Sequence, residues 1–139
     1  MNCATHRFVL GQQETMRVMV PVLARAKVEE HWMVWLDDSM NVIGKSMGGR
    51  GSEDICRISL QQIVRDACKH SAFYAVAMHN HPTSLWPEFS QADKAAAADI
   101  ARALSAVDVR MLDDIVVCRN GRWLSASAVN RSLRKARKR

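Results

Sequence analysis

Residues 77–93 read AMHNHPTSLWPEFSQAD, and the chain on both sides can be interpreted outward from this segment. His79 and His81 are two positions apart, so on an extended backbone their side chains point to one face and Asn80 points to the other. A proline then stops the strand, and a loop leads to Asp93, where a carboxylate can return as a third ligand. Two histidines, one aspartate and an open fourth position form the ligand set of a catalytic zinc site.

Each of these residues also has a simpler structural interpretation. Ser90 and Asp93 form S-x-x-D, which suits a helix N-cap followed by an acidic third residue, and Ser90 can serve both purposes. The two histidines could be packed, hydrogen-bonded side chains, although burying both in this register is costly without a shared purpose. We therefore predict a metal site made of His79, His81 and Asp93. Imidazole and carboxylate ligands suit zinc without excluding iron, manganese or nickel.

The flanking sequence predicts a mixed α/β order of elements. We expect helices over residues 12–29 with a bend at Pro21, 59–69 with Ser59 as N-cap, and 90–104, and strands over 31–37, 41–49, 71–79, 109–118 and 122–127. The first two strands should form an antiparallel hairpin, and the last two should flank the Asn120-Gly121 turn. The glycines at 48, 49 and 51 are expected to loosen the chain after the second strand.

Length and composition predict one domain. The chain has 139 residues, of which 48% are hydrophobic. This size suits a single core and is too small for two. We expect a domain over residues 1–127, with its core at about 14–127, followed by a basic tail over 128–139.

The cysteines and the apolar segments predict a reduced, cytoplasmic protein. Four cysteines are scattered without a C-x-x-C pair, at Cys3, Cys56, Cys68 and Cys118. That spacing argues against a thiolate metal site or a disulfide framework. We also expect neither a membrane span nor a signal peptide, because no apolar run is long enough and the N-terminus lacks the order of a leader.

The positive charge is concentrated at the C-terminus. The net charge is +6, and six of the 20 Lys and Arg residues lie in the final segment RSLRKARKR, residues 131–139. Such a tail could be a solvated extension, or it could contact nucleic acid nonspecifically or an acidic partner protein. It contains no aromatic residue on which bases could stack.

The central segment and two others together resemble a known family. The matching motifs are HNHP at 79–82, S-x-x-D at 90–93, EHW at 30–32 and LDDIVV at 112–117. They are similar to the JAB/MPN domain of the RadC type, the bacterial branch of the JAMM metalloprotease superfamily. The resemblance implies an α+β domain of three layers, with a mixed central sheet flanked by helices. RadC-type proteins usually carry a helix-hairpin-helix region before this domain, and we expect the present chain to be a stand-alone JAB module.

The resemblance also implies a role for each site residue. The zinc ligands would be His79, His81 and Asp93, with a water completing the tetrahedron. A glutamate before an early strand acts as general base in JAMM enzymes, and Glu30 fits that position, with Glu29 as the adjacent alternative. Ser90 would stabilise the oxyanion that forms on the attacked carbonyl. The implied reaction is hydrolysis of a peptide or isopeptide bond in a protein substrate.

One departure from the family pattern lies in the loop after the histidines. The family leaves seven residues between the second histidine and the serine, whereas residues 82–89 make eight. A loop absorbs an extra residue at little cost, so we expect the metal geometry to survive. Trp86 then stands where the family has small residues, either as a wall of a substrate groove or as a cover over the core.

Two functions from different classes follow from these residues. The first is a zinc metallohydrolase that uses the ligands and the base named above. The second is a non-catalytic, metal-containing binding module that joins DNA repair or other DNA-linked machinery through its basic tail. A base beside the metal separates the two, because a structural zinc site has no use for one.

Overall fold

The computed structural model describes residues 10–52 and 55–130. In chain order the elements are α1 (Leu10–Arg25), β1 (Glu30–Leu36), β2 (Val42–Ser52), β3 (Ile55–Ile58), α2 (Leu60–Lys69), β4 (Tyr74–His81), α3 (Gln91–Ser105), β5 (Arg110–Cys118) and β6 (Trp123–Ser125). A helical segment then occupies residues 126–130. The basic segment 131–139 lies outside the described residues.

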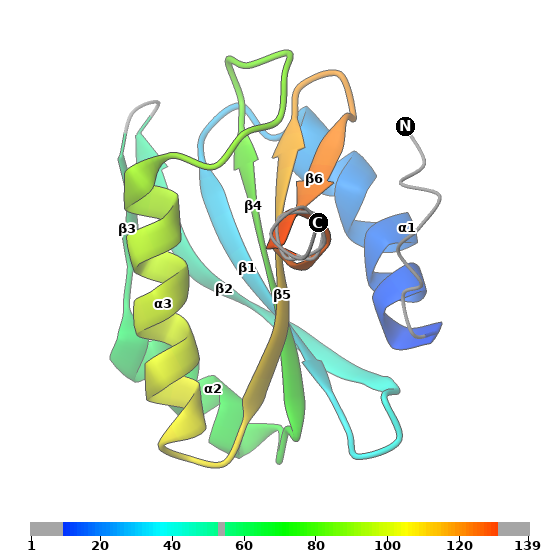
Figure 1. Cartoon of the computed structure of the whole chain (residues 1–139), viewed down its shortest axis with the longest axis vertical. Coiled ribbons are helices and arrows are strands. Elements are labelled where there is room, and N and C mark those ends of the chain that lie inside the picture. Colours follow the sequence, from blue (N-terminus) through cyan, green and yellow to red (C-terminus); the bar gives the residue numbers. More distant parts are fainter. Residues whose placement is uncertain (1–9, 53–54, 131–139) are drawn as a thin grey trace, which may run out of the picture.

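The strands form one mixed sheet in the order β3-β2-β1-β4-β5-β6 (Figure 1). β1 and β2 form the predicted antiparallel hairpin, and β1 also pairs antiparallel with β4. β4 and β5 are parallel, and the connection between them runs through α3, as a parallel pair requires. The strand that carries the two histidines is therefore central in the sheet, with a partner on each side.

Helices cover both faces of this sheet, which confirms the predicted three-layer domain (Figure 1). One buried cluster joins α1 to β1, β4 and β5 and consists of Met16, Met19, Leu23, Val34, Leu36, Val76, Met78, Ile115 and Val117. The other joins α2 and α3 to the opposite face and consists of Met33, Trp35, Ile63, Ala67, Ala75, Ala77, Ile100, Leu104 and Val109. Successive residues of β1 and β4 alternate between the two clusters, as the period of a strand dictates.

Local signals in the sequence mark one helix start and two turns correctly. Ser59 caps α2, where its side chain accepts a hydrogen bond from the Gln62 N–H. Asp37 closes the β1–β2 turn by accepting hydrogen bonds from two backbone N–H groups. Gly121 has a φ of +83°, which fits its place in the predicted turn before β6. These features act within a few residues of one another, so the sequence alone reveals them.

The region after the β1–β2 turn differs from the prediction. The glycines at 48, 49 and 51 do not loosen the chain; they continue β2 as far as Ser52, and β2 pairs there with the unpredicted edge strand β3. The β2–β3 pairing requires glycine at position 49, because a Cβ there would lie 2.2 Å from the Arg57 carbonyl oxygen. The glycines therefore permit close strand pairing.

Several other boundaries also shift. α1 ends at Arg25 rather than at 29, and β4 begins at Tyr74 and includes both histidines. The last strand ends at Ser125, whose hydroxyl accepts a hydrogen bond from the Ala128 N–H in the helical segment that follows. Among the described residues, no helix combines the length and the apolar character needed to cross a membrane.

Candidate metal centre

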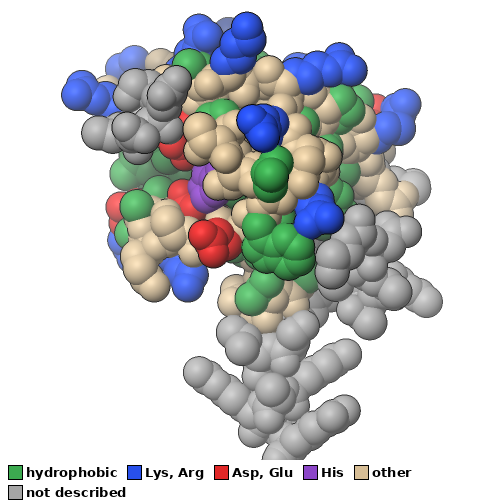
Figure 2. Space-filling view, turned by 90° about the horizontal axis from the view of Figure 1, so that it is seen from above, with side chains coloured by type: hydrophobic (Ala, Val, Ile, Leu, Met, Phe, Trp, Pro, Cys, Tyr) green, Lys and Arg blue, Asp and Glu red, His purple; other side chains and the backbone are tan. Residues whose placement is uncertain are grey.

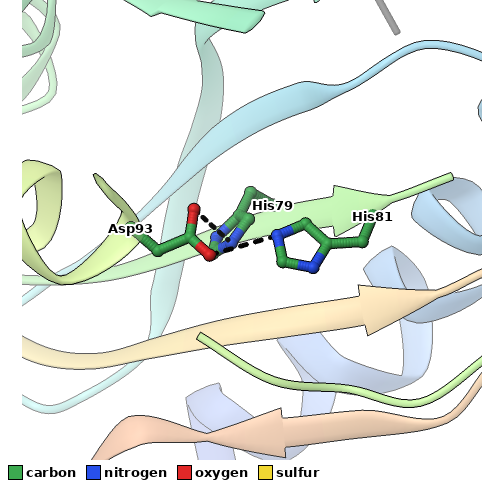
Figure 3. Close-up of side chains that lie close together, drawn as sticks. All are labelled: His79, His81 and Asp93. Carbon is green, nitrogen blue, oxygen red and sulfur yellow. Dashed lines mark ion pairs between the residues drawn. The ribbon is translucent and has the colours of Figure 1, made fainter. Parts of the chain in front are cut away.

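The end of β4 and the start of α3 bring His79, His81 and Asp93 together (Figure 3). The His79 Nε2 lies 3.4 Å from Asp93 Oδ1, and the His81 Nε2 lies 3.1 Å from Asp93 Oδ2. One ligand atom from each residue lies within 4.8 Å of the other two. The one-residue longer loop therefore leaves the three predicted ligands in reach of one another.

The separations of the donor atoms are close to those of ligands that share one metal ion. Bonds of about 2.0–2.2 Å place neighbouring ligand atoms about 3.3–3.6 Å apart in a tetrahedron. Each histidine Nε2 lies 3.1–3.4 Å from one of the two Asp93 oxygens. The His79 Nε2 is also buried, and it has no hydrogen-bond partner within residues 10–52 and 55–130. A buried polar atom without a partner is costly, and a metal ion between the three side chains would satisfy it. Both observations support a metal site here.

Ser90 has the capping role that its motif suggested. Its Oγ accepts a hydrogen bond from the Asp93 N–H at 3.0 Å, and its own N–H donates to Asp93 Oδ2 at 2.9 Å. This capping box begins α3 and also fixes the Asp93 carboxylate beside the histidines. Helix capping and metal ligation are therefore compatible, and the cap orients the ligand.

Asp114 is a site residue that sequence reasoning missed. It lies on β5, and its Oδ1 is 3.5 Å from the His79 Nδ1, the ring nitrogen that faces away from Asp93. A carboxylate in this position orients a histidine that binds a metal through its other nitrogen. The LDDIVV motif at 112–117 contains two adjacent aspartates. Only the pairing of β4 with β5 shows that Asp114, and not Asp113, faces His79.

Charge pairing dominates the protonation of the metal-free centre. Burial alone would lower the pKa of His79, but the adjacent carboxylates of Asp114 and Asp93 outweigh it and raise the pKa to about 10. Burial alone would raise the pKa of Asp93, whereas the bonds with His79 and His81 hold it well below its usual range. The metal-free centre therefore holds a proton on His79 that a metal ion would have to displace.

A pocket of about 370 Å³ opens over the three ligands. Its lining includes Glu29, His31, Ser90 and Asp114, together with alanines from the first turns of α3. Figure 2 shows a histidine side chain at the bottom of a hollow, with acidic side chains beside it. The pocket is large enough for one extended segment of a substrate, but not for a folded domain.

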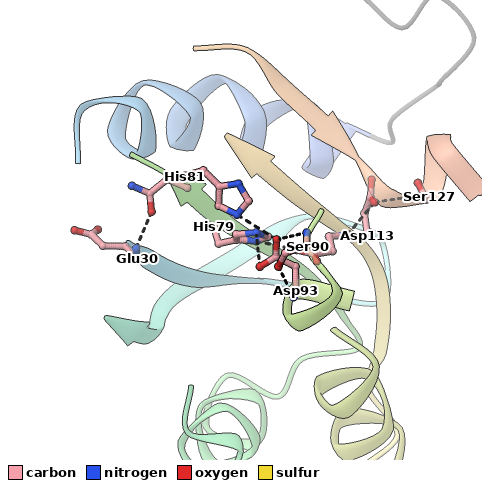
Figure 4. Close-up of polar contacts among 9 residues, drawn as sticks. Glu30, His79, His81, Ser90, Asp93, Asp113 and Ser127 are labelled. Carbon is pink, nitrogen blue, oxygen red and sulfur yellow. Dashed lines mark hydrogen bonds and ion pairs between the residues drawn. The ribbon is translucent and has the colours of Figure 1, made fainter. Parts of the chain in front are cut away.

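Glu29, rather than Glu30, lines this pocket. Burial raises the pKa of the Glu29 carboxyl, while the nearby His79 and His81 lower it and Asp93 raises it further. The Glu30 carboxylate instead accepts a hydrogen bond from the Trp32 indole at 3.1 Å and points away from the ligands (Figure 4). The expectation that Glu30 would face the metal therefore needs correction, and the adjacent alternative, Glu29, occupies the position.

The reason for this correction is the alternation of β1. His31 pairs with His79 in the antiparallel β1–β4 ladder, so both side chains lie on the face covered by α2 and α3. Glu30 and Trp32 then belong to the opposite face. Glu29, two positions before His31, returns to the side of the metal ligands.

His31 is a further residue of the pocket. Its ring stacks on that of His79 with 6.2 Å between centroids, and only 4% of its surface is exposed. Burial and the charge of His79 lower the pKa of His31 to about 4, although the negative charge of Asp114 acts to raise it. The ring is therefore neutral at pH 7, and its buried Nδ1 has no hydrogen-bond partner in the described part of the chain.

In the loop after the histidines, Phe89 lies beside His79, with 6.1 Å between ring centroids, whereas Trp86 lies away from the metal pocket. Trp86 is 64% exposed and stacks under the Arg122 guanidinium, 5.1 Å from the ring centroid. It lines a separate, mostly apolar hollow of about 250 Å³ together with β6 residues. Trp86 is thus neither a cover over the core nor part of the pocket that contains the ligands.

Comparisons with known proteins agree with this architecture. The RadC-like JAB domain family matches residues 9–131. The UPF0758 protein Bpet3149 of Bordetella petrii is 32% identical over 102 residues, which cover 73% of this chain and 44% of that protein. UPF0758 proteins of Vibrio cholerae and Coxiella burnetii are 30% and 29% identical, over 76% of this chain and 46% of theirs. The chain thus spans about half the length of these relatives.

Proposed function

Because this chain belongs to the RadC-like JAB domain family and gathers two histidines and an aspartate at one end of its sheet, we propose that it is a zinc-dependent metallohydrolase. The bond cleaved is an amide, in a peptide or in an isopeptide-linked protein. The observation that carries the proposal is the Glu29 carboxyl, which lines the same pocket as the three ligands and has a raised pKa. A purely structural metal site needs no such group.

The metal would be held by His79, His81 and Asp93, with Asp114 orienting the first of them. Bound zinc lowers the pKa of a coordinated water from about 15.7 to around 7 and polarises a carbonyl oxygen. The imidazole and carboxylate donors suit this ion. The protein residues around the ligands then have to move a proton and stabilise a developing charge.

Glu29 takes the proton from the attacking water and later delivers it to the leaving amine. Its raised pKa suits both steps, because a carboxyl with a pKa closer to neutral accepts and returns a proton more readily. Ser90 lines the same pocket, and its Oγ accepts a bond from the Asp93 N–H, which leaves its hydroxyl hydrogen free to be donated. That hydroxyl stabilises the oxyanion on the attacked carbonyl.

The adjacent glutamates provide a matched pair of variants for testing this function. We expect about one zinc per chain in the wild type, in Glu29→Gln and in Glu30→Gln, and none in the His79→Ala/His81→Ala variant. Hydrolysis of a panel of peptide and isopeptide substrates should be lost in Glu29→Gln, by a factor of about 10² or more, and kept in Glu30→Gln. Metal content by atomic absorption and hydrolysis rates are measured on the same samples.

Three results would count against the proposal. Wild type without bound metal would reduce the histidines to a packing feature. Metal without hydrolysis of any substrate in the panel would favour the binding module. Loss of activity in Glu30→Gln but not in Glu29→Gln would return the general base to Glu30.

The second candidate, a metal-containing module that contacts nucleic acid through the basic tail, depends on residues 131–139, which lie outside the described part of the chain. The Glu29 carboxyl beside the ligands favours hydrolysis over this alternative. The tail contact is a separate proposal that a salt-dependent DNA-binding measurement with and without residues 131–139 would test.

A further inference from the structure

Asn80 stands between the two histidine ligands on β4, and its side chain makes contacts on the other face of the strand. It is buried, with 1% of its surface exposed. Its Oδ1 accepts a hydrogen bond from the Glu30 N–H at 2.6 Å (Figure 4), and its Nδ2 donates to the Val28 carbonyl at 3.0 Å. The partners lie about 50 residues earlier in the sequence, in the segment that connects α1 to β1.

These two bonds bracket Glu29. One neighbour of this residue is held through its carbonyl and the other through its N–H. The Glu29 carbonyl itself accepts a bond from the Gly51 N–H at 2.9 Å. Because the backbone partners are an unambiguous donor and acceptor, only one orientation of the Asn80 amide satisfies both.

The Asn80 amide extends the β1–β4 ladder beyond its last backbone pair. The final pair in that direction is His31 with His79, and Glu29 lies outside β1. On the β2 side, the Gly51 N–H already holds the Glu29 carbonyl, but on the β4 side Glu29 belongs to a connecting segment, whose position varies more than that of a strand. The side chain of Asn80 supplies the missing donor and acceptor.

We propose that Asn80 is a positioning residue that fixes Glu29 relative to the metal ligands. The same three residues of β4 then present two ligands on one face and anchor the general base from the other. A movement of β4 carries ligands and base together, which keeps their separation constant. This inference rests on the role of Glu29 proposed above.

Hydrogen exchange of the Glu30 amide, in wild type and in Asn80→Ser, tests the anchoring. In wild type, the Glu30 amide should be as protected as amides in the interior of β1. In Asn80→Ser, it should exchange about tenfold faster or more, because a buried donor loses its acceptor. Rapid exchange of the Glu30 amide in wild type would overturn the proposal.

A second measurement asks whether Asn80 acts through Glu29. The full chain is loaded with Co²⁺, whose visible absorption responds to its coordination, and the midpoint of the absorption change is followed with pH. Glu29→Gln should move this midpoint by about one pH unit or more, the scale of removing a charge beside an ionising group. Asn80→Ser should move it in the same direction, and Glu29→Gln/Asn80→Ser should match Glu29→Gln alone.

Asn120→Ser is the matched control. Asn120 also bridges two backbone segments, since it donates to the Leu85 carbonyl and accepts from the Arg122 N–H, and neither of these bonds reaches the segment around Glu29. The pH midpoint of the Co²⁺ absorption change in Asn120→Ser should equal that of wild type.

The possible failures are distinguishable. A shift in Glu29→Gln with none in Asn80→Ser, or with fully additive shifts in the double variant, would overturn the role of Asn80 alone. No shift in Glu29→Gln would overturn the proposed base and, with it, this inference.

Discussion

Asp114 and Asp113 are adjacent on β5 and have different surroundings. The Asp114 carboxylate faces the Nδ1 of His79, in the pocket above the metal ligands. The Asp113 carboxylate lies on the other face of the sheet, where it accepts hydrogen bonds from the Ser125 hydroxyl and the Ser127 N–H. At the scale of single residues, the Asp114 carboxylate therefore contacts a candidate metal ligand. The Asp113 carboxylate instead binds the end of β6 and the residues that follow it.

Asp114→Asn should therefore weaken zinc binding by about 10–100-fold, the usual effect of removing a carboxylate that orients a histidine ligand. Competition with a chromogenic chelator measures this affinity. Asp113→Asn is the control, and it should lower the melting temperature while leaving zinc affinity unchanged. Equal losses of affinity in the two variants would show that the contact with His79 is not responsible.

His31 should make the metal-free protein sensitive to acid. Its pKa is lowered to about 4 by burial and by the charge of His79, below the ordinary value of 6.5. Between these two pH values the unfolded chain binds one more proton than the folded chain, so stability falls as the pH drops through this window. The full loss is about 3 kcal/mol. His79 has the opposite shift, to about 10, so its stabilisation is present below pH 6.5 and is lost as the pH rises toward 10.

Urea unfolding of metal-free protein at a series of pH values measures these slopes. His31→Phe keeps an aromatic ring and removes the titrating group. Between pH 6.5 and 4, the free energy of unfolding of His31→Phe should fall by about 1.4 kcal/mol less per pH unit than that of wild type. This difference in slope corresponds to one proton. Parallel curves for wild type and variant would contradict the assignment to His31.

At the scale of elements, the alternation of β1 decides which glutamate lies on the side of the three candidate ligands. The pair of His31 with His79 places odd-numbered positions on the side of the ligands. A shift of one residue in this register would exchange Glu29 for Glu30. The α3 cap adds the third ligand, because the same hydrogen bonds that begin the helix orient the Asp93 carboxylate.

The β2–β3 pair makes a separate prediction about glycine. Gly49→Ala would place a Cβ 2.2 Å from a backbone carbonyl oxygen, that of Arg57, which cannot move without separating the strands. We expect a loss of about 2 kcal/mol or more in the free energy of unfolding. Gly48→Ala should cost less, because its Cβ would meet only side chains, at 3.0 Å or more. Chemical denaturation of both variants checks the order, and a larger loss in Gly48→Ala would contradict it.

At the scale of the whole molecule, the candidate metal site joins segments that lie far apart along the chain. The ligands come from β4 and α3, the proposed base from the segment before β1, and the orienting carboxylate from β5. The unfolded chain does not hold these groups together. Metal binding should therefore favour the folded state by mass action.

Removal of the metal should lower the melting temperature. At free zinc about 100 times the dissociation constant, binding contributes about 2.7 kcal/mol to the free energy of unfolding. Calorimetry with and without a chelator measures the difference, and the His79→Ala/His81→Ala variant should not respond. An equal response in that variant would mean that the chelator acts elsewhere.

The sequence alone identified the features whose parts lie close together along the chain. The histidine pair, the S-x-x-D cap of α3, the Ser59 cap and the turn at Gly121 depend on contacts within a few residues, so their spacing reveals them. The family motifs also predicted the three layers and the mixed sheet, which the structure confirms.

Only the tertiary structure selected Glu29 over Glu30, brought Asp114 to His79 and tied Asn80 to the segment before β1. Each of these contacts depends on the pairing register of strands that are tens of residues apart. A shift of one residue reverses which face a side chain occupies, and the local sequence contains no signal that fixes this register. The same reason explains why β3 was missed, since its pairing with β2 depends on the close backbone approach at Gly49.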